Sequence, residues 1–183
     1  RGPNGDGLSD ATTIPAQWTV NDYNWSIKLP GVGHSSPVVW GKRLFVTCGE
    51  RDTGKRMIVC LDGASGKTRW QRDYESRTFS QSGDNSYATA TPAADADGVV
   101  VTWTTPSEVV LLALDNEGRE VWRRELGKYV CIHGSGVSPI IVDDLVVLNN
   151  DQEDPKALPP SVYAGPDAPK SAGASFVLGV ARK

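Results

Sequence analysis

Apolar and polar positions along the chain fall into short runs of the kind that form β-strands separated by turns. Residues 57–61 are all apolar, and a polar turn that contains Gly66 follows at 62–67. A short run rich in Val, Ile and Leu favours a buried strand. Asp62 can bond backbone groups of the turn, and Gly66 supplies positive φ without steric cost. With Trp70 on the strand that follows, the pattern predicts a β-hairpin.

The same unit occurs a second time at 113–122. Each copy has an apolar strand ending in Leu-Asp, a small polar turn ending in Gly, a basic residue and then Trp. The shared positions are Asp62, Gly66 and Trp70 in the first copy and Asp115, Gly118 and Trp122 in the second. A repeated unit indicates the architecture more strongly than any single motif does.

Four short strands are expected in each repeat. The first repeat covers 34–74, with strands at 36–40, 43–47, 57–61 and around Trp70. The second covers 85–126, with strands at 88–93, 99–103, 109–114 and 120–125. The third covers 133–183, with strands at 137–142, 145–148 and 175–181 and an inserted loop at 149–174. Four strands in about 40–50 residues are typical of a propeller blade, so we expect an all-β fold of four-stranded antiparallel blades.

Residues 1–33 are expected to form an irregular lead-in followed by an outer strand. The run from Trp25 to Leu29 has the same spacing of apolar residues as 70–74 and 122–126. In closed propellers an N-terminal strand often completes the last blade. Two full blades and part of a third cannot close a ring of four to eight blades. We therefore expect the missing blades to come from a longer parent chain or from self-association.

The insert at 149–174 is rich in Pro, Asp, Gly, Ala and Lys. Stretches of this length without a strand or helix pattern are usually functional or disordered. Its composition favours a mobile surface loop over a second small domain. The acidic and amide residues at 149–154 offer oxygen ligands for Ca²⁺, but they lack the glycines of a compact cation loop, so an acidic solvated turn is the favoured interpretation.

Charge and hydropathy exclude several classes of function. The formal net charge of -3 leaves no electrostatic footprint for nucleic acid or for an anionic membrane surface. No apolar run approaches the roughly 20 residues of a membrane-spanning helix. Because the chain starts at Arg1 and not at Met, we expect a processed product or a fragment from which a leader has been removed.

The three cysteines do not make a complete disulfide framework. Cys48 and Cys60 lie at equal distances from Gly54, the expected tip of a hairpin, which leaves two interpretations. They form either a bridge between neighbouring strands or a pair of buried thiols, and the thiols are favoured because such bridges need unusual geometry. Cys131 has no evident partner, and no pair has the spacing of a metal site.

The repeat resembles that of the pyrroloquinoline-quinone-like (PQQ-like) β-propellers, whose motif is close to Ala-x-Asp-x-x-Thr-Gly-x-x-x-Trp. Here Ser65 stands in the Thr place, and the second copy is one residue shorter. The resemblance implies that Trp70, Trp122 and Trp25 dock against neighbouring blades. Stretches 1–7, 33–41 and 148–152 are most similar to secreted or periplasmic PQQ-like repeat proteins of planctomycete-type bacteria.

One polar residue lies just ahead of the expected first strand in each of the three blades. They are His34, Asn85 and His133. First strands line the central channel of a propeller, so these side chains are candidates for binding a metal or a small anion at the channel mouth. The alternative, which we favour, is that they cap the strand starts through hydrogen bonds.

The resemblance implies a range of functions, because the family includes quinoprotein dehydrogenases and outer-membrane assembly scaffolds. The dehydrogenases hold PQQ over Ca²⁺ and usually carry adjacent cysteines, which this chain lacks; their catalytic Asp and Ca²⁺ ligands have no assignable counterpart here. We therefore predict a non-catalytic binding or scaffolding module in the periplasm or secreted, with no cofactor and a protein partner on a loop-rich face. The alternatives are part of a PQQ- and calcium-dependent oxidoreductase, or the sensor domain of a signalling chain.

Overall fold

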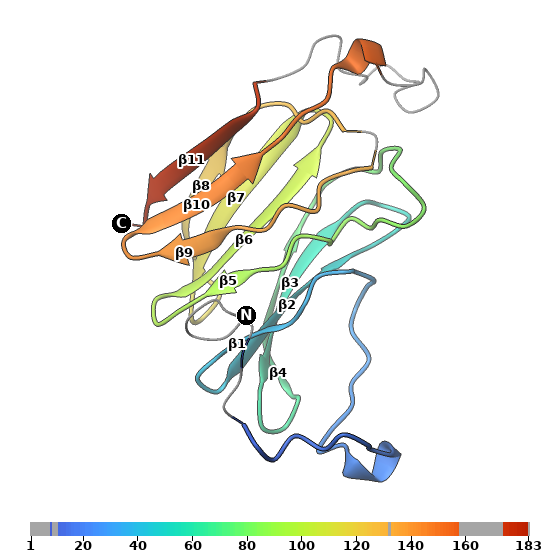
Figure 1. Ribbon diagram of the computed structural model, residues 1–183, viewed down its shortest axis with the longest axis vertical. Helices are drawn as coiled ribbons and strands as arrows, with labels where there is room; N and C mark the ends of the chain where they lie inside the picture. The colour runs from blue at the N-terminus through green and yellow to red at the C-terminus, as the bar shows by residue number, and fades with distance from the viewer. Residues whose placement is uncertain (1–7, 9–10, 132, 158–173, 183) are drawn as a thin grey trace.

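Three antiparallel sheets make up the protein in the computed structural model, which describes residues 8, 11–131, 133–157 and 174–182 (Figure 1). The first sheet has the order β1-β2-β3-β4 and the second β5-β6-β7-β8, and the third has the order β11-β10-β9. The all-β fold of blade-like antiparallel sheets is therefore confirmed. The three sheets do not close a ring in this chain.

The strands follow the repeat. In the first sheet they are β1 (Val38–Trp40), β2 (Arg43–Gly49), β3 (Arg56–Asp62) and β4 (Thr68–Tyr74). In the second they are β5 (Ala93–Ala94), β6 (Gly98–Thr105), β7 (Glu108–Asp115) and β8 (Glu120–Glu125). In the third they are β9 (Ile140–Val142), β10 (Leu145–Asn150) and β11 (Phe176–Ala181). Two short 3₁₀ helices, Val20–Asp22 and Pro155–Ala157, lie outside the sheets.

The two ends of the sheets differ in their connections (Figure 1). One end, here called the turn end, carries tight turns at 41–42, 63–67, 95–97, 116–119 and 143–144. The other, here called the loop end, carries the connections 50–55, 75–92, 106–107, 126–139 and 151–175. Because neighbouring strands are antiparallel, connections alternate between the two ends, and the long ones all fall at the same end.

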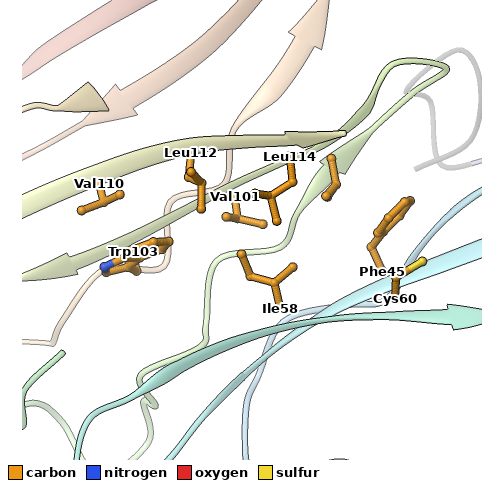
Figure 2. Packing of buried hydrophobic residues seen from close by; sticks show 9 residues of the cluster. Phe45, Ile58, Cys60, Val101, Trp103, Val110, Leu112 and Leu114 are labelled. Carbon is orange, nitrogen blue, oxygen red and sulfur yellow. The ribbon is translucent and has the colours of Figure 1, made fainter. Parts of the chain in front are cut away.

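The core lies between the sheets. Side chains of β2 and β3 meet those of β6 and β7 in the first interface, of which Figure 2 shows Phe45, Ile58, Cys60, Val101, Trp103, Val110, Leu112 and Leu114. Alternate residues of β7, Leu111 among them, point to the other face and pack with Val146 and Leu148 of the third sheet. Between its two acidic end residues, β7 is apolar at 109–114, where both of its faces are buried. Each such large side chain contributes about 1.5–3 kcal/mol to the free energy of folding.

The third sheet buries one face and exposes the other. Val146, Leu148, Leu178 and Val180 pack toward the second sheet. The opposite face presents apolar side chains that are 44–70% exposed: Ile140, Val142, Leu145 and Val177. Side chains alternate between the two faces along a strand, and in this sheet both sets of positions are apolar. The sheet thus has two apolar faces, as a sheet that is covered on both sides does.

The outer strand expected at Trp25–Leu29 is not formed within the described chain, and its pairing with a further blade stays a prediction. This segment forms no ladder with a strand of the described chain; the one backbone bridge in the lead-in joins Val32 to Gly49. An outer strand needs a third strand of its own sheet to pair with. The segment instead lies over the outer face of the first sheet, where Trp25 and Leu29 pack against the cluster that contains Val46.

Three boundaries also differ from the prediction. The second sheet starts at Ala93 and not at 88, because Ser86 and Thr89 form local hydrogen bonds that hold 85–89 in a turn; the hydroxyl of Thr89 donates to Ser86 O at 3.0 Å. The third sheet starts at Ile140 and not at 137. The insert starts after Asn150, which pairs with Phe176 in the β10–β11 ladder. Residues 158–173 of the insert lie outside the described residues.

Cys48 and Cys60 do not face each other. Cys48 pairs with Met57 and Cys60 with Phe45 in the β2–β3 ladder. The residue opposite Cys48 is therefore three positions earlier than equal distances from Gly54 implied, and this odd shift puts the two thiols on opposite faces. Cys48 and Cys60 are buried thiols that form no disulfide with each other.

Candidate functional site

The same tryptophan contact occurs three times along the turn end. The indole nitrogen of Trp25 donates to Gly63 O at 3.1 Å, that of Trp70 to Asn116 O at 2.9 Å, and that of Trp122 to Arg182 O at 3.0 Å. Gly63 and Asn116 directly follow the Asp of their repeats, and Arg182 follows Ala181, which occupies the Asp position in the third. Each contact joins one segment to the turn end of the next sheet.

Two glycines allow the tryptophan rings to approach the turns. Gly66 has φ of +69° and Gly118 has φ of +76°, both in the left-handed region. A Cβ atom at Gly66 would lie 2.5 Å from Cε3 of Trp25, and one at Gly118 would lie 2.7 Å from Cδ2 of Trp70. Glycine is therefore required at both positions by backbone conformation and by space.

The repeat aspartates organise the turns. Asp62 accepts hydrogen bonds from the amides of Ala64 at 3.2 Å and Ser65 at 3.0 Å, and it forms an ion pair with Arg69 at 2.5 Å. The hydrogen bonds from Arg69 and Ser65 lower the pKa of Asp62 to about 2. The carboxylate is thus held in its charged form by the turn that it caps.

Asp115 plays the same part in the second repeat. It accepts from the amides of Glu117 at 2.9 Å and Arg119 at 2.8 Å, and from Nε of Arg119 at 2.7 Å. Desolvation opposes the charged form, but these hydrogen bonds outweigh it and lower the pKa of Asp115. The sequence alone indicated that these aspartates cap turns, and the geometry assigns their partners.

An arginine two residues after the tryptophan strengthens the second contact. Nε of Arg72 donates to Gly118 O at 2.6 Å, and its guanidinium lies 5.8 Å from the centroid of the Trp70 ring. Arg124 lies 5.6 Å from the Trp122 ring in the same relation. A guanidinium stacked on an indole contributes about 0.5–1 kcal/mol at an exposed site. Sequence reasoning missed these arginines, although their shared spacing after Trp was a usable signal.

His34, Asn85 and His133 all lie at the loop end. The side-chain amide of Asn85 donates to the backbone oxygen of His133 at 2.5 Å, so these two residues are in contact. The backbone amide of His34 donates to Ala88 O at 2.9 Å, and both histidine side chains are exposed. In the described part of the chain, no three His, Cys, Asp or Glu side chains gather where they could hold a metal ion.

The oxygen-rich stretch at 149–154 is divided between a strand and a loop. Asn149 belongs to β10, and its amide donates to Asp151 at 2.9 Å. The side chain of Gln152 donates to Lys128 O at 2.8 Å, and Asp154 accepts from the amide of Lys156 at 2.9 Å. These contacts tie the start of the insert to the preceding loop. Its polar groups are therefore hydrogen-bonded to other groups of the same chain.

A buried arginine that the sequence did not single out lies between the first two sheets. Arg56 is 4% exposed and donates to Gly54 O at 2.6 Å and to Thr104 O at 3.2 Å. Its guanidinium lies 4.6 Å from the centroid of the Tyr87 ring. Burial lowers the pKa of Arg56 to about 10. Its position at the head of the apolar run 57–61 was the only sequence signal.

The described residues do not fit a bound PQQ with Ca²⁺. The inner strands β1, β5 and β9 carry only Val, Trp, Ala and Ile. Ahead of them, the side-chain oxygen of Asn85 already accepts from the amide of Ser86 at 2.8 Å, and no group of three acidic or His side chains is available among the residues described. A hard cation such as Ca²⁺ needs several oxygen ligands at one point.

The repeated tryptophan-on-turn contact, together with the four-stranded sheets, defines a β-propeller protein of the PQQ-like repeat class. The family model described as outer membrane protein assembly factor BamB matches residues 10–159, and the chain belongs to this family. No curated protein matches the chain in sequence.

Two solved structures are similar to parts of this chain. The crystal structure of BamB from Moraxella catarrhalis is 23% identical with a TM-score of 0.46, and the match covers 68% of this chain and 33% of that one. A europium-containing methanol dehydrogenase is 18% identical with a TM-score of 0.42, and the match covers 70% of this chain and 22% of that one. The chain thus spans a third or less of the length of either protein. Within the described residues, no helix has the length and apolar character to cross a membrane.

Proposed function

We propose that this chain is the blade-forming part of a non-catalytic β-propeller that binds a protein partner outside the cytoplasm. Membership of the family described as outer membrane protein assembly factor BamB supports a scaffolding role and a place outside the cytoplasm. The sheets supply a rigid frame, and partner recognition belongs to the connections that this frame presents.

The observation that carries the proposal is the difference between the two ends of the sheets. At the turn end, the tight turns after Asp62 and Asp115 are contacted by Trp25 and Trp70, and Trp122 makes the equivalent contact with the third sheet. At the loop end, the connections 75–92 and 126–139 are longer and carry exposed polar side chains. The loop end is therefore the surface on which a partner binds, with His34, Asn85 and His133 at the mouth of the channel.

The ring is completed by further blades, supplied by the same polypeptide or by other copies. The outward face of the third sheet supports this part of the proposal, because Ile140, Val142 and Val177 expose apolar surface with the alternation of a packed sheet. A neighbouring blade would bury this surface as the third sheet buries that of the second.

Site-specific photo-crosslinking in cells that express the complete protein tests the proposal. A photoreactive phenylalanine is placed at exposed loop-end positions Asp52 and Lys128, and at the matched turn-end positions Lys42 and Asp144. We expect discrete crosslinked products to a protein partner from the loop-end positions only. Crosslinking confined to the turn-end positions, or absent from all four, contradicts the proposed binding face.

A further inference from the structure

The second interface, between the second and third sheets, is built from the same positions of the repeat as the first. Phe45 pairs with Cys60 in the β2–β3 ladder, and both side chains lie in the first interface (Figure 2). Val100 pairs with Ala113 in the β6–β7 ladder, and both lie in the second interface. Cys60 and Ala113 each stand two residues before the aspartate of their repeat, so the two pairs are equivalent. The second interface therefore has Val in the place of Phe and Ala in the place of Cys.

In the first interface the ring of Phe45 fills the space beside the outer-strand tryptophan. Phe45 is fully buried, and its ring centroid lies 5.9 Å from that of Trp70. Trp122 is the equivalent tryptophan of the second interface, and Val100 has no ring with which to reach it. Protein interiors are closely packed, so a shorter side chain at a conserved point of the repeat leaves a void unless its neighbours fill it.

A cavity of about 90 Å³ lies at this place in the second interface. Most of its lining is apolar: Val100, Ala113, Leu114, Trp122, Ile141 and Val146. Ile141 stands where the first interface has the smaller Ala94, because each pairs with the equivalent valine of its sheet. The larger side chain takes up only part of the space, and the cavity remains. Its lining also includes Val121, which is 56% exposed, so the cavity is open to solvent on that side.

The polar side chains of the lining are engaged with one another or with the main chain. Arg182 forms an ion pair with Asp95 and donates to Oδ2 of Asp97 at 2.9 Å. The indole nitrogen of Trp122 donates to the main-chain oxygen of Arg182 at 3.0 Å. An occupant would therefore gain little from a charge or from hydrogen-bonding groups. Apolar cavities stay dry and take up small apolar molecules, because this removes apolar surface from water.

We propose that this cavity binds one small, neutral, apolar molecule of the size of a short alkane. An engineered apolar cavity of about 150 Å³ holds benzene or xenon, and one of about 90 Å³ is too small to enclose a full aromatic ring. The occupant lies beside Trp122, in the position that corresponds to the Phe45 ring of the first interface. The site is at the turn end, away from the proposed partner surface, so it does not depend on that surface.

Diffraction from crystals of the complete protein under xenon pressure tests the proposal, with xenon as the probe. We expect an anomalous xenon peak between Val100, Trp122 and Ile141. Val100→Phe introduces the ring of the first interface and should abolish the peak. Val39→Phe, the same change at a valine that is 61% exposed and outside the cavity, should retain it. No peak in the unaltered protein, a peak of equal height in Val100→Phe, or a protein side chain in the cavity overturns the proposal.

Methyl NMR of the complete protein under xenon pressure gives a second readout, in solution. The methyl resonances of Val100, Ile141 and Val146 should shift along a saturable curve, whereas those of Val39 should not. Ala113→Cys narrows the cavity without adding a ring and should weaken these shifts, so the test does not depend on the folding of Val100→Phe. Shifts that rise linearly with pressure at all four residues, or that are unchanged in Ala113→Cys, overturn the proposal.

Discussion

The indole nitrogen of Trp70 donates a hydrogen bond to the main-chain oxygen of Asn116, 2.9 Å away and 46 positions further along the chain. Trp70 stands on the outer strand of the first sheet, and Asn116 lies in the outer turn of the second. The contact therefore joins two sheets that no backbone ladder connects. Its equivalents at Trp25 and Trp122 extend the same link along the turn end.

Substitution of Gly118 tests the space beneath this ring. Gly118→Ala places a Cβ 2.7 Å from Trp70 on a residue with φ of +76°. We expect the free energy of unfolding to fall by about 2–4 kcal/mol, from the left-handed backbone and the steric overlap together. Urea unfolding measures the change. Gly83→Ala is the control, because an added Cβ there would have no atom within 4 Å and φ lies outside the left-handed region; it should stay within about 0.5 kcal/mol of the unaltered protein.

The hydrogen bond of Trp70 can be separated from the packing of its ring. Trp70→Phe removes the N–H donor and should cost about 1 kcal/mol of unfolding free energy, whereas Trp70→Ala also removes the ring and should cost about 3 kcal/mol. Trp18→Phe makes the same change at a side chain that is 63% exposed and should have no measurable effect. Equal costs for Trp18→Phe and Trp70→Phe would show that the contact with Asn116 contributes nothing.

The charge of Asp62 makes stability depend on acid pH. Its pKa is about 2 in the folded protein, mainly because of the Arg69 hydrogen bond, and about 3.9 in an unfolded chain. Since the folded-state pKa is lowered, the contribution of Asp62 to stability is complete above about pH 4 and is lost as pH falls through about 2. An NMR titration of the Asp62 carboxyl carbon measures the pKa. Arg69→Ala should raise it toward 3.9; a pKa near 3.9 in the unaltered protein contradicts the turn geometry.

The reactivity of the cysteines should follow their burial. Burial raises the pKa of the Cys60 thiol to about 11 and also raises that of Cys48. At pH 8 we expect both to react slowly with a thiol reagent in the native protein, and Cys131, which is only half-buried, to react first. Mass spectrometry of the denatured, unreduced protein should find Cys48 and Cys60 as free thiols. A peptide pair linked between Cys48 and Cys60 would contradict the observed β2–β3 register.

The sequence was most informative where structure depends on neighbouring residues. The hairpins around Gly66 and Gly118 are set by an aspartate, a glycine and a tryptophan within nine positions, so their turns and most of their strands were predictable. The segment that starts at Trp25 has the same spacing of apolar residues as the outer strands of these hairpins, but strand formation also needs a pairing partner. That partner is a matter of tertiary structure, and local spacing does not reveal it.

Contacts between sheets were predictable only where the repeat implied them. The register of β2 against β3 depends on the loop at 50–55, in which Gly54 lies off centre, so equal spacing of Cys48 and Cys60 from it was misleading. Arg56 and Thr104 belong to different repeats and occupy positions that are not equivalent, so no periodicity connects them. Their hydrogen bond emerges only from the packing of the two sheets.

A titration of the complete protein with pyrroloquinoline quinone, with and without Ca²⁺, tests the non-catalytic binding role most directly. The six tryptophans provide the fluorescence signal. The proposed function predicts no saturable quenching that depends on Ca²⁺. Saturable, Ca²⁺-dependent quenching at micromolar quinone would contradict it and indicate part of a quinoprotein oxidoreductase.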